Sequence, residues 1–250
     1  MIITDKFVFL HFPKTGGLFV AGALKKLSER SGGRCTCREL LLPNLKRIDG
    51  AGVNNVHGTC EQIPAEDRPK PIVSCIRNPF DRYVSTYEFR NWVQQPARFL
   101  PEIKERFPRF PDLTFAEYVE FINIYDIRSR TDHELLTADI GMISYAFIQF
   151  FARDPRRAIR ELGEADLGLA AVTFLRTEDL NRQLYEYLQK MDYNDEDIRF
   201  ILAEERSNAT PARQGKAGWR QYYDRKLYEQ VRQKESLLFK LFPEYDQPLT

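Results

Sequence analysis

Short apolar runs alternate with longer stretches of helical periodicity along most of this 250-residue chain. The runs at 6–12, 71–76 and 171–175 are nearly free of polar residues. Runs of this length are typical of strands that are buried on both faces of a parallel sheet. Because these runs alternate with helical stretches, we expect helices to cover both sides of the sheet. The pattern therefore predicts a three-layer α/β fold with a central, mostly parallel sheet.

The helical stretches have apolar residues at a spacing of three and four. One helix is expected over 18–30, and Pro79 favours the start of another that continues to about residue 92. A weaker apolar pattern over 34–42 is compatible with a further strand. The remaining helices are expected over 115–124, 141–151, 180–191, 195–205 and 223–242.

No internal repeat or low-complexity tract divides the chain, so we expect one domain over residues 1–250. Residues 95–112 combine prolines with aromatics and arginines, which favours a lid or surface excursion over a linker. Residues 207–250 are expected to form a polar loop followed by the terminal helix.

The bulk composition limits the partners that the chain can have. A formal net charge of +1 argues against a large nucleic-acid or anionic-membrane footprint, but it allows a local cationic cluster for a small anion. No apolar run reaches the roughly 18 residues of a membrane helix, and the N-terminus lacks a secretory pattern. We therefore expect a cytoplasmic protein without stable membrane insertion. The sequence does not predict its oligomeric state.

The four cysteines favour reduced thiols over a metal site. Cys35 and Cys37 are too close for the C-x₂-C spacing of zinc knuckles, and Cys75 lies within an apolar run. A metal site at the close pair is the weaker alternative.

The first apolar run leads directly into a glycine turn that carries a cation. In Pro-Lys-Thr-Gly-Gly, Gly16 and Gly17 allow a tight turn that points amides at an anion where a helix begins. Lys14 adds a charge and Thr15 a hydroxyl donor. The lysine precedes the glycines, so this is not a Walker A motif. The alternative is an ordinary surface turn.

The second run leads into Arg-Asn-Pro-Phe-Asp-Arg-Tyr-Val-Ser. Arg77 follows the strand directly, and Ser85 lies one helical turn beyond Arg82. A guanidinium and a hydroxyl suit phosphate oxygens, although Arg82 could equally be a helix-surface charge or a cap. Carboxyl ends of parallel strands share one edge of a sheet, so the two turns suit a ligand with two separate phosphate groups.

Together these two motifs resemble sulfotransferases that use 3′-phosphoadenosine 5′-phosphosulfate (PAPS), and within them the carbohydrate-type branch. The similarity extends to Phe-Leu-Arg-Thr-Glu-Asp-Leu at 174–180 and to the terminal tyrosine-rich helix. The resemblance implies a P-loop-like form of the α/β fold. It also implies transfer of a sulfuryl group from PAPS to a hydroxyl of a carbohydrate or glycoconjugate. The product would be adenosine 3′,5′-bisphosphate (PAP), and no metal would be needed.

The resemblance assigns the first motif to the 5′-phosphosulfate, with Lys14 on the bridging oxygen and Thr15, Gly16 and Gly17 lining the loop. The expected cofactor-binding segment continues through Leu18 and Phe19. Relatives commonly have hydroxyl residues at these two positions, so backbone amides and Thr15 must contribute more of the binding here.

For the second motif, the resemblance assigns the 3′-phosphate to Arg77 and Ser85. The loop that carries Arg213 and Lys216 is expected to fold over the nucleotide, or else to be a solvated loop.

The general base that removes the proton from the substrate hydroxyl is expected to be His57, in Asn-Val-His-Gly-Thr. A histidine bonded to neighbouring backbone is the alternative reading, and Glu61 is a reserve base or an orienter of the imidazole. His11 is expected to be a packed neighbour.

Two other functions remain open. One is a P-loop-type phosphotransferase, which the missing Walker serine disfavours. The other is a non-catalytic nucleotide-binding module, which the Leu18-Phe19 departure makes plausible.

Overall fold

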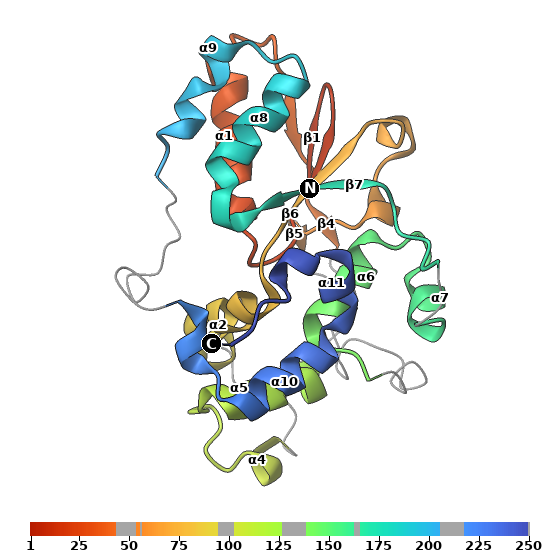
Figure 1. The fold of residues 1–250 in the computed structure, drawn as a ribbon. Helices are drawn as coiled ribbons and strands as arrows, with labels where there is room; N and C mark the ends of the chain where they lie inside the picture. Colours follow the sequence, from red (N-terminus) through yellow and green to blue (C-terminus); the bar gives the residue numbers. More distant parts are fainter. Residues whose placement is uncertain are drawn as a thin grey trace. The chain divides into compact units, whose positions relative to one another are not determined.

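A computed structural model describes residues 1–43, 54–55, 57–94, 103–126, 139–162, 166–205 and 218–249 (Figure 1). The chain forms two compact units, unit 1 (Met1–Arg77 and Phe147–Ala209) and unit 2 (Asn78–Ala146 and Thr210–Thr250), and each is described by itself. The expectation of one domain over 1–250 stays a prediction. The predicted excursion lies outside the described residues over 95–102, as does the predicted loop over 207–217.

Unit 1 contains a five-stranded sheet in the order β3-β1-β2-β6-β7. Its core is parallel, because β6 pairs in parallel with β2 on one side and with β7 on the other. This confirms the predicted parallel core. β1 pairs antiparallel with both β2 and β3, so the sheet is mixed. The strands are β1 (Ile2–Thr4), β2 (Val8–Leu10), β3 (Cys37–Glu39), β6 (Ile72–Ile76) and β7 (Val172–Arg176), and a separate pair is formed by β4 (Leu42–Pro43) and β5 (Asn54–Asn55).

Alternate residues of these strands face two different helical layers, as the pleat of a strand requires. On one face, Phe9, Val73 and Leu175 belong to a buried cluster with the apolar sides of α1 (Gly17–Arg30) and α8 (Leu180–Lys190). On the other face, the Phe174 ring meets Phe147 and Phe151 of α6 (Met142–Phe151), with centroids 5.4 and 5.0 Å away. The three-layer prediction is therefore confirmed.

Two further helices complete unit 1. α7 (Pro155–Arg160) was not predicted; Asp154 caps it by accepting from the Arg157 amide, and Pro155 stands at its first position. The helix predicted over 195–205 is shorter: α9 (Asp195–Ile198) continues as a 3₁₀ turn over Arg199–Leu202.

Unit 2 is built from helices around aromatic side chains. Phe80 stacks against both Trp219 and Tyr228, with ring centroids 4.7 and 4.6 Å away. The side chain of Asn78 caps α2 by accepting from the Phe80 amide. The helices are α2 (Pro79–Phe89), α3 (Asn91–Gln94), α4 (Ile103–Arg106), α5 (Phe115–Phe121), the π-helical turn Ile122–Asp126, the first half of α6, α10 (Arg225–Lys234) and α11 (Ser236–Leu241).

The single terminal helix predicted over 223–242 is wrong, because it is divided into α10 and α11 at Glu235. Glu235 is fully buried, and its carboxylate accepts hydrogen bonds from the first turn of α6. None of the described helices is long and apolar enough to cross a membrane.

Candidate functional site

The three parallel strands of unit 1 end at the same edge of the sheet. The register pairs Leu10 with Ser74 and Ile76 with Arg176, so the chain leaves β2, β6 and β7 at neighbouring positions. The segments that follow begin with His11, Arg77 and Thr177. The edge where the sequence predicted an anion site therefore brings together residues from three distant parts of the chain.

The segment after β2, residues 12–17, is called the Lys14 loop below. Its backbone turns through two left-handed positions, Lys14 with φ 65° and Gly16 with φ 87°. A lysine in this conformation is strained by about 1 kcal/mol or more, and such positions cluster at functional sites. Turns of this kind bring successive amides to one side, which suits an anion, and α1 begins immediately afterwards at Gly17.

Both glycines of the Lys14 loop are held by close packing. A Cβ atom on Gly17 would lie 2.0 Å from Cδ2 of His11, so only glycine fits against that ring. A Cβ atom on Gly16 would lie 2.6 Å from Cδ2 of Leu180, where α8 begins. The double glycine therefore lets the loop lie between the His11 ring and α8.

Three predicted ligand residues of this segment have their side chains elsewhere. Thr15 is fully buried, and its hydroxyl donates to the Phe12 carbonyl at 2.8 Å, which holds the loop closed. Phe19 packs in the core of unit 1, whereas Leu18 is 59% exposed at the start of α1. An anion bond from the Thr15 hydroxyl, and any ligand role for Leu18 or Phe19, stay predictions.

Arg77, which is half-buried, contacts the Lys14 loop directly. Its Nη1 donates to the Lys14 carbonyl at 3.3 Å, so the two predicted cationic segments adjoin each other. Thr177 lies between them on the third strand end, with its hydroxyl oxygen 2.8 Å from the Thr15 carbonyl and 2.9 Å from the Ile76 carbonyl. The guanidinium of Arg77 and the first amides of α1, on a loop that also carries Lys14, suit an anionic ligand with more than one charged group.

His57 lies beside His11 at this edge. Its Nδ1 is 2.9 Å from the His11 carbonyl oxygen, and the two imidazole centroids are 4.6 Å apart. A carbonyl can only accept, so Nδ1 of His57 carries the proton and Nε2 keeps a lone pair. The His57 imidazole is therefore held in the tautomer that a general base requires.

His11 has different chemistry. It is 5% exposed, and Nδ1 has no hydrogen-bond partner among the described residues. The pKa of His11 is lowered to about 3, mainly by burial and to a smaller extent by the neighbouring His57 and the N-terminal charge. This imidazole stays neutral at physiological pH, which agrees with the expectation of a packed neighbour.

The remaining predicted site residues lie in different places. Glu61 is exposed on the 3₁₀ turn Cys60–Gln62, and its role as a reserve base or an orienter of the imidazole stays a prediction. Ser85 is half-buried on α2, which belongs to unit 2, so its predicted partnership with Arg77 stays a prediction. Arg213 and Lys216 lie outside the described residues.

Arg82 is only 3% exposed, so the reading of this residue as a helix-surface charge is wrong.

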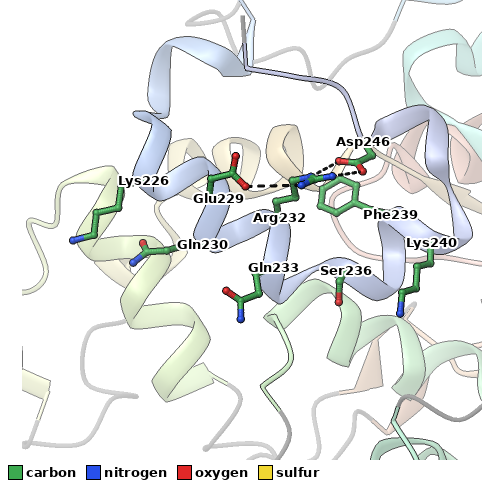
Figure 2. Close-up of a pocket in the computed structure, with 9 residues that line it drawn as sticks. All are labelled: Lys226, Glu229, Gln230, Arg232, Gln233, Ser236, Phe239, Lys240 and Asp246. Atoms are coloured by element: carbon green, nitrogen blue, oxygen red, sulfur yellow. Dashed lines mark hydrogen bonds and ion pairs between the residues drawn. The ribbon is translucent and has the colours of Figure 1, made fainter.

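Unit 2 has a pocket of about 590 Å³ along α10, α11 and the C-terminal segment (Figure 2). Arg232 lies at its centre and is paired with Asp246, with Nε 2.6 Å from Oδ1. This pocket contains none of the predicted site residues. In the part of the chain that the structure describes, no group of three His, Cys, Asp or Glu side chains could hold a metal ion.

No protein-family model matches the chain, and no curated protein matches it. Among solved structures, the chain is similar to the crystal structure of mouse sulfotransferase SULT7A1 complexed with PAP. The alignment covers 96% of this chain and 88% of that chain, at 16% sequence identity and a TM-score of 0.48. Similarity at this level does not extend to activity, so we argue function from the site itself.

Sequence reasoning missed the role of Thr177. The sequence analysis named this residue only as part of the segment 174–180. Its position directly after a predicted strand was the available signal, because the ends of all three parallel strands lie at the same edge of the sheet.

Proposed function

We propose that this protein is a PAPS-dependent sulfotransferase that moves a sulfuryl group to a hydroxyl of a carbohydrate or glycoconjugate. The observation that carries the proposal is the contact between Arg77 and the Lys14 loop at the edge where His57 also lies. Two cationic segments that adjoin each other suit one ligand with two phosphate groups, and an imidazole beside them whose Nδ1 faces a carbonyl suits a hydroxyl acceptor.

Each residue then has a definable task. The acceptor hydroxyl attacks sulfur and gives its proton to Nε2 of His57, while the new S–O bond forms and the bond from sulfur to the phosphate oxygen breaks. The ammonium of Lys14 stabilises the charge that develops on the departing phosphate, which is the electrostatic form of catalysis. Arg77 binds the second phosphate and fixes the position of the nucleotide.

Calorimetry with adenosine 3′,5′-bisphosphate tests donor binding without magnesium. We expect Arg77→Ala and Lys14→Ala each to lose about 1.5–3 kcal/mol of binding free energy, the range for hydrogen bonds to charged groups. Lys14→Gly is a second variant, because glycine adopts the left-handed backbone of this position without strain. The binding free energy that it loses therefore reports on the missing ammonium and not on a strained backbone.

The matched control is Lys25→Ala, because Lys25 is an exposed lysine of α1 paired with Glu39. Its affinity for the bisphosphate should equal that of the wild type. Wild-type heats indistinguishable from buffer would overturn the proposal. Turnover of ATP that requires magnesium would favour the phosphotransferase instead.

Transfer from PAPS to a panel of saccharides, with His57→Asn as the variant, separates an enzyme from a binding module. The asparagine amide can still donate to the His11 carbonyl, but it has no basic nitrogen. We expect the turnover rate to fall by about 10²–10⁴, the usual contribution of a general base, with bisphosphate affinity unchanged. Equal turnover in variant and wild type would contradict the role of His57, and bound nucleotide without any turnover would favour the binding module.

A further inference from the structure

Thr177 is the first residue after β7, directly beyond the register pair Ile76 and Arg176. Its hydroxyl oxygen lies 2.8 Å from the carbonyl oxygen of Thr15 and 2.9 Å from that of Ile76. One acceptor belongs to the Lys14 loop, and the other belongs to the peptide that leads into Arg77. The hydroxyl has one proton, which the two carbonyl oxygens share in a three-centre hydrogen bond, so a single side chain contacts both cationic segments through their main chains.

These contacts fix more than the two carbonyl oxygens. A peptide unit is planar, so a carbonyl held by Thr177 also sets the direction of the amide on the same peptide. The carbonyl of Thr15 shares its peptide with the Gly16 amide, and that of Ile76 shares its peptide with the Arg77 amide. Thr177 therefore orients a backbone donor in each segment.

The methyl group of Thr177 lies close to the same loop. A Cβ atom at Gly16 would lie 3.8 Å from Cγ2 of Thr177, next to the closer Leu180. The Thr15 hydroxyl already donates to the Phe12 carbonyl within the Lys14 loop. Thr177 adds a hydroxyl from outside the loop that contacts the loop backbone at the Thr15 carbonyl.

We propose that Thr177 is a positioning residue that sets the spacing between the Lys14 loop and Arg77. This spacing lets a ligand with two phosphate groups bind more tightly than a ligand with one. This inference rests on the proposed function. It adds that the advantage of the bisphosphate depends on one hydroxyl that touches neither phosphate.

The test measures dissociation constants for adenosine 3′,5′-bisphosphate, adenosine 5′-monophosphate and adenosine 3′-monophosphate. In Thr177→Val, which has nearly the same shape without a hydroxyl, the bisphosphate should bind up to about tenfold more weakly, because the energy of one partly buried hydrogen bond is the most that positioning can contribute to binding. The two monophosphates should change by less than about threefold, because each engages one segment only. The ratio between bisphosphate and monophosphate affinities is the readout, since a general loss of stability would not change it selectively.

Thr177→Ser should restore the wild-type ratio, because it returns the hydroxyl. Thr173→Val is the matched control, since Thr173 is an exposed threonine of the same strand, and its ratio should equal that of the wild type. If Thr177→Val does not fold, Thr177→Cys offers a weaker donor of similar size and should give an intermediate ratio.

An unchanged ratio in Thr177→Val, or in Thr177→Cys where Val does not fold, would overturn the inference while leaving the proposed function intact. A wild type that binds none of the three nucleotides would overturn the proposed function itself. Equal losses for all three nucleotides in Thr177→Val would also overturn the inference, because they would indicate a general structural role.

Discussion

His11 and His57 are neighbouring imidazoles whose surroundings give them different chemistry. His57 is half-buried and donates from Nδ1 to a carbonyl, which leaves Nε2 basic. His11 is enclosed by Gly17 and by the His57 ring, and its pKa is lowered to about 3, first by burial and then by His57. Two histidines whose ring centroids are 4.6 Å apart thus differ in role: His57 is a candidate base, and His11 is a neutral packing group.

The low pKa of His11 can be observed by NMR titration of its ring resonances. We expect His11 to stay neutral down to about pH 4, because its pKa is near 3, whereas an unburied histidine titrates near pH 6.5. In His57→Ala the pKa of His11 should rise, since one of the causes that lower it is removed. A titration midpoint near 6.5 for His11 in the wild type would contradict the prediction.

The same shift has a consequence for stability. The unfolded chain protonates His11 below about pH 6.5 while the folded protein does not, so unfolding takes up a proton. Stability should therefore fall as the pH decreases from about 6.5 towards 3, by up to about 1.4 kcal/mol per pH unit from this one group.

Among the secondary-structure elements, α6 depends on a buried charge at its start. The Glu235 carboxylate accepts from the amides of Ile143 and Ser144 at 3.0 and 2.7 Å, and from the Ser144 hydroxyl at 2.7 Å. The Tyr83 hydroxyl donates to the same carboxylate at 2.6 Å. A Cβ atom on Gly141 would lie 2.2 Å from Oε1 of Glu235, so glycine is needed there. A carboxylate at this end of a helix also interacts favourably with the helix dipole.

Glu235→Gln should lower the free energy of unfolding by about 2–3 kcal/mol, because the glutamine amide brings donors against the donors around it and the charge is lost. Urea denaturation followed by aromatic fluorescence measures the change. Glu229→Gln is the matched control on α10, which ends just before Glu235, since Glu229 is exposed and 3.9 Å from Arg232, and its substitution should cost less than about 0.5 kcal/mol. Equal losses in the two variants would show that the buried carboxylate does not stabilise the fold in this way.

At the scale of the whole molecule, the chain order separates parts of the site that the sheet brings together. β6 and β7 are hydrogen-bonded neighbours in unit 1, although residues 77–171 lie between them in the chain. Most of that interval belongs to unit 2. The proposed donor site therefore depends on long-range strand pairing, which forms against a higher loop-closure entropy than local contacts do.

Much of the fold follows from the sequence alone. β2, β6 and β7 were predicted because continuous apolar runs signal buried parallel strands, and α1 and α8 were predicted from their periodicity. β1 was not predicted, because Ile2–Thr4 is too short for a distinct pattern. The break between α10 and α11 was missed as well, since nothing in the local sequence indicates that Glu235 is fully buried.

The sequence by itself determined which segments carry the candidate chemistry: the glycine turn with Lys14, Arg77 after its strand, and His57 in a short loop. These are local signals, because apolar runs, glycines and prolines act on the backbone that carries them. Only the tertiary structure decided the tautomer of His57, the inward turn of the Thr15 hydroxyl and the contact of Thr177 with the Lys14 loop and the end of β6. The His57 and Thr177 contacts depend on which distant segment supplies the partner atom, and the packing of the whole sheet determines that partner. The Thr15 hydroxyl turns to the Phe12 carbonyl three residues earlier, a choice between loop and ligand that the local sequence leaves open.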